Sequence, residues 1–147
     1  MNAILDFKGF KVQNVEYDLI DFENFENTDN DEILEKIKNG QVNVDISARV
    51  FDDQESDFSH IDVNVNTTDK LVDEVRRVSI TITGAFKINA PELDENEREE
   101  LLKINGTAIL LPYCRNYLSN LTGFDTTYSQ LLMPPFNVTT LFENQED

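Results

Sequence analysis

Two side chains of this sequence, His60 and Cys114, could act as a general base and a nucleophile, and each is the only residue of its type. A cysteine activated by a nearby imidazole can attack acyl groups. Cys114, however, falls on the apolar stripe of a predicted helix, whereas His60 falls on the polar side of a predicted strand. We therefore favour a buried structural thiol over a catalytic pair. One histidine and one cysteine also cannot supply a zinc-ligand cluster.

The other candidates for chemistry are phosphate-binding loops and carboxylates. The sequence has no G-x-x-x-x-G-K and no G-x-G-x-x-G segment, so we expect no nucleotide site and no ATP-driven work. Its 29 acidic residues lack the D-x-D-x-D-G spacing of a calcium loop. A hydrolytic pair cannot be singled out among them, and solvated surface charge is the favoured interpretation. We predict a protein that is not an enzyme and needs neither metal nor cofactor.

The composition is that of a strongly acidic, single-domain protein. Its 147 residues, 39% of them apolar, can fill one core, and we treat 1–147 as one domain. A net charge of −17 repels nucleic acid and acidic membrane surfaces and selects basic partners. We find no leader-like segment, and the longest apolar run, Ala108–Leu111, is far too short for a membrane span. A single cysteine, which cannot form an internal disulfide, agrees with a reducing compartment. We therefore predict a cytoplasmic protein that does not insert into membranes.

The first half of the sequence alternates apolar and polar residues, as strands with one buried face do. This period-two pattern occurs in residues 10–19, 42–50, 61–65 and 78–88. Four such segments predict an antiparallel sheet that is covered on one face only. The fold class is therefore α+β, with C-terminal helices packed on that face.

Two strands contain irregularities. In the first, the apolar parity changes between Val12 and Val15, which predicts a bulge near Gln13 and Asn14. In the last, Gly84 interrupts the apolar face, so we expect a bulge or a close backbone approach there.

Helices follow the strands. Asp94 and Glu97 have capping-box spacing before a helix, and Asn105-Gly106 separates it from a second helix that ends at Gly123. Pro112 lies inside the second helix, which should kink or restart there because proline has no N–H and crowds the preceding turn. A short amphipathic helix over residues 31–38 is closed by Asn39-Gly40.

The segment after the second helix is apolar, aromatic and interrupted by two prolines, so it is poorly suited to a strand ladder. Such a surface could hold many different polypeptides through apolar contacts. The alternative is that the segment simply packs on the sheet. The candidate binding residues are Tyr128, Leu131, Leu132, Met133, Phe136, Leu141 and Phe142.

The run LLPYCRNYLSNL and the later PPFNVTTLF resemble the SecB family of protein-export chaperones. Pro112, Tyr113 and Arg115 match a Phe-Pro-Tyr-Ala-Arg-like run of the family's main helix. The later family elements, a stretch that ends in proline and a last helix, are matched by Pro134 or Pro135, by Phe136-Asn137 and by Leu141-Phe142. The resemblance therefore covers about Ile104 to Phe142. It implies a four-stranded antiparallel sheet with packed helices, assembled as a homotetramer that is a dimer of dimers.

The resemblance also implies a function. Family members hold unfolded preproteins in apolar grooves without ATP and pass them to the translocation motor SecA, which an acidic patch on the sheet attracts. Relatives stabilise antitoxins in toxin-antitoxin systems, and this remains an alternative. An acidic patch of this kind is expected at Glu16, Asp18, Asp21, Glu23 and Glu26, although solvated charge also explains it.

The main helix provides the candidate contacts between subunits. Core packing is the alternative for its apolar members, and an ion pair between subunits is the preferred role of the arginine. The candidate interface residues are Leu110, Tyr113, Arg115, Tyr117 and Leu121.

Two other function classes stay open. An acidic inhibitor that imitates nucleic acid would also explain the charge, and an enzyme of unrecognised type would need a buried, strongly shifted carboxylate.

Overall fold

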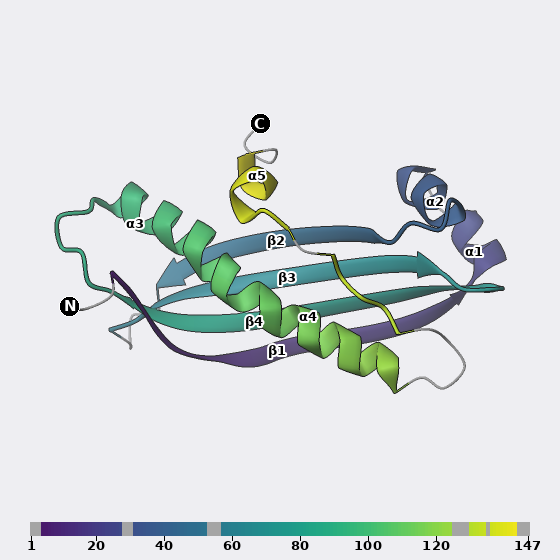
Figure 1. Ribbon diagram of the computed structural model, residues 1–147, viewed down its shortest axis with the longest axis horizontal. Helices are drawn as coiled ribbons and strands as arrows, with labels where there is room; N and C mark the ends of the chain where they lie inside the picture. Colours follow the sequence, from purple (N-terminus) through teal and green to yellow (C-terminus); the bar gives the residue numbers. More distant parts are fainter. Residues whose placement is uncertain (1–3, 28–30, 53–56, 125–129, 135, 144–147) are drawn as a thin grey trace.

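A computed structural model describes residues 4–27, 31–52, 57–124, 130–134 and 136–143. Its centre is a four-stranded antiparallel sheet, in the order β1-β4-β3-β2, which confirms the predicted α+β class. Strands β2, β3 and β4 form a meander, and β1 returns beside β4, which is a Greek-key order. Strands β1 and β2 are therefore the sheet edges (Figure 1). The strands are β1 (Leu5–Asp21), β2 (Asn43–Asp52), β3 (Ser59–Lys70) and β4 (Glu74–Ile88).

The bulge predicted in the first strand is confirmed. The register of β1 against β4 shifts between Val12 and Asn14, which places Val12 and Val15 on the same face of the sheet, opposite Ile82 and Ile80. A second shift, which the alternation did not reveal, lies between Phe7 and Gly9, and Gly9 has a φ of +117°. Glycine suits this position because side chains disfavour positive φ.

One long helix crosses the sheet diagonally (Figure 1). It consists of α3 (Glu95–Leu101), a π-helical turn η1 (Leu102–Gly106) and α4 (Thr107–Gly123). The predicted capping box is confirmed, with the Asp94 carboxylate accepting from the Glu97 N–H at 2.8 Å. Helix α4 begins directly after Asn105-Gly106 and ends at Gly123, as predicted, although η1 joins it to α3 without a break. Helix α4 also continues through Pro112 without a restart, and the irregularity of the long helix lies at η1 instead.

The helix packs closely on what we call the helix face of the sheet. A Cβ on Gly84 would lie 2.9 Å from Leu110 Cδ1, so the close approach predicted at Gly84 is confirmed. Along the helix, Gly106 lies against Ile61 of β3, Leu110 against β4, and Tyr113 against Phe10 of β1. The main core fills this side of the sheet with aliphatic side chains of β3, β4 and α4.

The opposite face, which we call the open face, is covered at one end, so the expectation of a sheet covered on one face only was incomplete. Helices α1 (Phe22–Glu26) and α2 (Asp31–Lys38) pack there around a second small core of Phe25, Leu34, Ile37 and Val75. Val75 shares the parity of Arg77 and Ser79, opposite to the parity of the main core. Helix α2 has the predicted bounds, and the turn that follows it contains Gly40, which has a φ of +77°.

The C-terminal residues return along the helix face. Residues 130–134, which we call the C-terminal strap, lead to helix α5 (Val138–Glu143) over η1. Lys103 lies 4.8 Å from the centre of the Phe142 ring, which joins α5 to the long helix.

Candidate binding surfaces

Strand β1 presents apolar side chains to solvent on the helix face. Val12, Val15 and Leu19 belong to the face that is buried on β3 and β4, yet they are 39%, 43% and 42% exposed. The ring contacts of the long helix with β1 are at Phe7 and Phe10, and beyond them Val12, Val15 and Leu19 are left partly exposed. A long edge strand with exposed apolar residues is a site where another chain can pair.

Two tyrosines of α4 extend this surface. The Tyr113 ring lies 4.4 Å from the Phe10 ring, and Tyr117 meets the same ring edge-on at 6.3 Å, while 37% and 40% of these tyrosines stay exposed. We call Val12, Val15, Leu19, Tyr113 and Tyr117 the β1–α4 surface. The tyrosines were predicted from the sequence. The three β1 residues were missed because alternation shows which face a residue takes but not that its strand is an edge.

The other predicted interface residues lie elsewhere. Leu110 is fully buried against Gly84 and belongs to the core of this chain. Leu121 is half-buried and packs against the main core. Arg115 donates from Nε to the Met133 carbonyl at 3.2 Å and from Nη2 to the Pro134 carbonyl at 3.4 Å. Its described hydrogen bonds therefore hold the strap within the chain, and the ion pair between subunits stays a prediction.

The strap is tied to α4 at three levels. Besides the Arg115 contacts, the Leu131 N–H donates to Thr122 Oγ1 at 2.9 Å, and Gln130 Nε2 donates to the Ser119 carbonyl at 2.7 Å. Thr122 Oγ1 in turn donates to the Leu118 carbonyl at 2.8 Å. The extended strap thus satisfies part of its backbone through α4 side chains rather than through a strand ladder.

These ties point alternate strap side chains in opposite directions. Leu131 and Met133 are buried in the main core, as is Phe142 of α5, whereas Leu132 is 70% exposed. Phe136 and Leu141 are half-buried. Tyr128 lies outside the described residues. Of the predicted binding residues described, Leu132 is therefore the one that faces solvent most. Phe124, which follows α4, is 81% exposed.

The five predicted acidic residues are all exposed and occupy the α1 end of the molecule. Glu16 and Asp18 project from β1 onto the open face, opposite Ser79 and Arg77. Asp21 ends β1, and Glu23 and Glu26 belong to α1, where Glu26 pairs with Lys38 at 3.2 Å.

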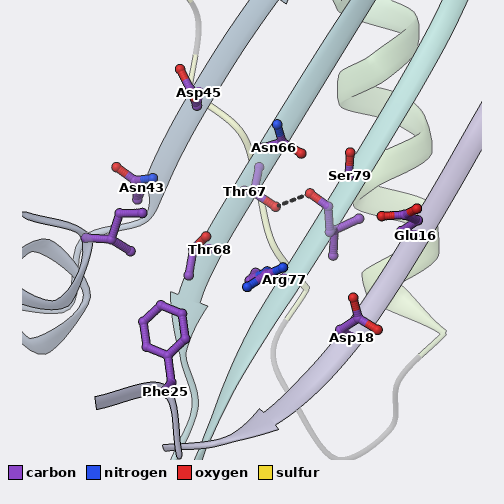
Figure 2. A pocket seen from close by; sticks show the side chains of 12 residues that line it. Glu16, Asp18, Phe25, Asn43, Asp45, Asn66, Thr67, Thr68, Arg77 and Ser79 are labelled. Atoms are coloured by element: carbon purple, nitrogen blue, oxygen red, sulfur yellow. Dashed lines mark hydrogen bonds between the residues drawn. The ribbon is translucent and has the colours of Figure 1, made fainter. Parts of the chain in front are cut away.

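A polar cavity of about 300 Å³ lies beside Glu16 and Asp18 (Figure 2). Figure 2 shows Arg77 of β4 between Thr68 of β3 and Asp18, with Asp45 of β2 at the far side. Three carboxylates from β1 and β2 and one arginine therefore line the cavity, and this charge favours a cationic partner.

The two residues that could have formed a catalytic pair are separated by the sheet. Cys114 is fully buried on the helix face, and burial raises the pKa of its thiol to about 12, so it stays protonated. His60 lies on the open face, stacked 5.3 Å from the Phe51 ring. Among the described residues, no three His, Cys, Asp or Glu side chains group as metal ligands. Within the same residues, no helix is long and apolar enough to cross a membrane.

Comparisons with known proteins agree with this architecture. Residues 10–147 match the family described as preprotein translocase subunit SecB. The fold is similar to that of the Mycobacterium tuberculosis SecB-like chaperone Rv1957, solved in complex with a ChAD peptide from the HigA1 antitoxin. That similarity has a TM-score of 0.59 and 13% identity over 90% of each chain.

A protein of unknown function from Streptococcus agalactiae is similar with a TM-score of 0.45 and 17% identity, over 89% of this chain and 97% of that one. No curated protein matches the sequence. The family match spans nearly the whole sequence, and the chain therefore belongs to the SecB family of chaperones, which are not enzymes.

Proposed function

We propose that this protein is a cytoplasmic holdase that binds unfolded preproteins on exposed apolar surface, without ATP, and keeps them competent for export. The observation that carries the proposal is exposed apolar surface on a chain of charge −17. Val12, Val15, Leu19, Phe124 and Leu132 are each at least 39% exposed. Exposed apolar surface ordinarily promotes aggregation, and a large net charge keeps such a protein soluble.

The exposed apolar residues divide into two roles in this proposal. The β1–α4 surface joins copies of the chain into a homotetramer, a dimer of dimers. Its residues lie on an edge strand and the adjoining helix, where a second copy can place the same residues in a twofold contact. The strap and α5, with Leu132, Phe136 and Leu141, form the client-binding surface together with Tyr128.

The holdase activity is tested by diluting a chemically unfolded protein into buffer and following its light scattering. We expect an excess of this chain to suppress the scattering without added nucleotide. Leu132→Ser should weaken the suppression, whereas Val72→Ser should not, since Val72 is 84% exposed in the turn between β3 and β4, outside both surfaces. Full scattering in the presence of the wild-type chain would rule the activity out.

Delivery to SecA is the second part of the proposal. The acidic α1 end of the open face, including Glu16 and Asp18, is the surface that would attract a basic docking segment of the motor. Replacing both residues by lysine should weaken SecA binding, while Glu92→Lys, an exposed change in the segment between β4 and α3, should have a smaller effect.

An antitoxin is the alternative client. This candidate is supported by the fold similarity to Rv1957, which was solved with an antitoxin peptide. Titrating SecA and antitoxin-derived peptides against the same preparation separates the two, because an export chaperone binds SecA whereas a dedicated antitoxin chaperone does not need to. Family membership favours either chaperone over an inhibitor that imitates nucleic acid.

A further inference from the structure

Four cations lie at one end of the open face among the described strand residues, although the chain as a whole carries −17. Lys11 and Lys87 have the parity of this face, opposite Thr83 and Asp6, and Arg49 of β2 lies on the same face. Lys8 adds a fourth cation at the bulge before Gly9. Two of the four are paired, Lys8 with Asp6 at 2.8 Å and Arg49 with Asp62 at 3.1 Å. Exposed Asp52 and Asp57 lie where β2 ends and before β3 begins.

Two of these cations, Lys8 and Lys11, line a cavity of about 390 Å³ that spans all four strands. Lys8 and Lys11 of β1 form one wall, and Phe51 of β2 and His60 of β3 form another. The Phe51 and His60 rings stack at 5.3 Å with an interplanar angle of 18°. The Arg49 guanidinium lies 5.1 Å from the Phe51 ring centre, so this aromatic wall is also positively charged at its edge.

Polar atoms of His60 and Asp62 lie beside this cavity. Nδ1 of His60 is buried and has no hydrogen-bond partner among the described residues. Asp62, by contrast, is occupied twice, since it accepts from Thr83 Oγ1 at 2.6 Å as well as from Arg49. The His60 nitrogen is sealed from solvent, so a ligand in the cavity meets the lysines and the aromatic rings rather than Nδ1.

We infer that this cavity binds an acidic peptide segment that carries an aromatic side chain. Carboxylates of the peptide meet Lys8 and Lys11, and its aromatic ring lies against the stacked Phe51 and His60 rings. A free inorganic anion would use the lysines and leave the aromatic wall without contact. The charge here is opposite in sign to that at Glu16 and Asp18 on the same face, so the two ends select partners of opposite charge.

The chain contains no tryptophan, which provides a direct assay. The probe is a five-residue blocked peptide, with one tryptophan between two pairs of glutamates, followed by its own fluorescence during titration with the wild-type chain. A peptide with lysines in place of the glutamates tests the sign of the charge. We expect saturable binding of the acidic peptide and much weaker binding of the basic one.

Variants locate the binding. The double variant Lys8→Glu with Lys11→Glu should raise the Kd of the acidic peptide by roughly tenfold, because two attractive pairs become repulsive. Lys36→Glu, an exposed change on α2, is the matched control and should change the Kd by less than about threefold. Phe51→Leu should also weaken binding, since it removes the stacked wall while keeping an apolar side chain.

Three results would overturn the inference: absence of saturable binding, equal binding of the basic peptide, or an equal effect of Lys36→Glu. The result is independent of the holdase assay, because the client and assembly surfaces lie on the helix face. If the lysine variant still suppresses client scattering but loses the acidic peptide, both proposals stand separately. If the wild-type chain neither binds the acidic peptide nor suppresses scattering, the titration refutes this inference and the scattering assay refutes the holdase proposal.

Discussion

Replacing Tyr117 by alanine should weaken the subunit assembly that we propose through the β1–α4 surface. Tyr117 is 40% exposed in the single chain, so of the roughly 200 Å² that a tyrosine side chain can bury, about 80 Å² remain for a partner. At about 25 cal/mol per Å² this area corresponds to about 2 kcal/mol. A twofold interface contains the substitution twice, which gives about 4 kcal/mol, or roughly a thousandfold increase in the dissociation constant.

The assay is a dilution series of the purified chain, with the molar mass measured by sedimentation or light scattering. We expect the Tyr117→Ala chain to dissociate at protein concentrations at which the wild type stays assembled. Val72→Ala removes a more exposed apolar side chain in the turn between β3 and β4, and it should leave the assembly unchanged. Thermal unfolding of both variants checks that the subunit itself is intact, because Tyr117 also contacts Phe10.

The reasoning is refuted if the dissociation constant of Tyr117→Ala is within about threefold of wild type, since about 0.6 kcal/mol would then be the whole contribution of both copies. An equal loss of assembly in Val72→Ala would refute it too. That outcome would indicate that total exposed apolar area, rather than the β1–α4 surface, holds the subunits together.

Three further predictions concern the subunit. Gly84→Ala places a Cβ 2.9 Å from Leu110 Cδ1 and should lower the free energy of unfolding, measured in urea, by about 1–3 kcal/mol. Combined with Leu110→Ala, the loss of stability should be smaller than the sum of the two single losses. Thr122→Val leaves the buried Leu131 N–H without its acceptor, which should lower the free energy of unfolding by about 1–3 kcal/mol. It should also speed proteolysis of the C-terminal segment. The exposed change Thr139→Val should do neither. Burial raises the pKa of the Cys114 thiol from 9.0 to about 12, so the neutral buried thiol stabilises the fold fully below pH 9, and this stabilisation is lost as the pH rises toward 12. The unfolding free energy of the wild type should therefore fall more steeply between pH 9 and 12 than that of Cys114→Ala. Parallel curves for the two proteins would contradict this.

The sequence predicted most features that depend on local periodicity. The bulge at Gln13 followed from a change of parity within one strand, and helix α2 and the Asp94 cap followed from spacing over a single turn. The covering of the open face by α1 and α2 was missed, although Ile20 and Val75 are apolar at positions of polar parity. Those two exceptions were the available signal that a second core covers the end of that face.

The bounds of α4 were predicted, but the continuity of the long helix was not. Asn-Gly is typical of a turn, but Gly106 serves here to bring the helix close to β3, because a Cβ would lie 3.3 Å from Ile61 Cγ2. Pro112 is tolerated because it and Ala108 are both exposed, so water can bond the carbonyl that lacks its helical donor. The direction of each strap side chain also depended on tertiary contacts, since Thr122 and Arg115 fix which strap residues face the core.

The place of β1 in the sheet also has a consequence for synthesis on the ribosome. This strand is made first, yet it pairs only with β4, and its first rung joins Leu5 to Ile88. The apolar side chains of β1 therefore stay unpaired until more than half of the polypeptide has emerged and β4 is available. Such non-local pairing slows folding and prolongs exposure to aggregation. The proposed holdase thus passes, as a nascent chain, through an early period in which its own apolar side chains are open to aggregation.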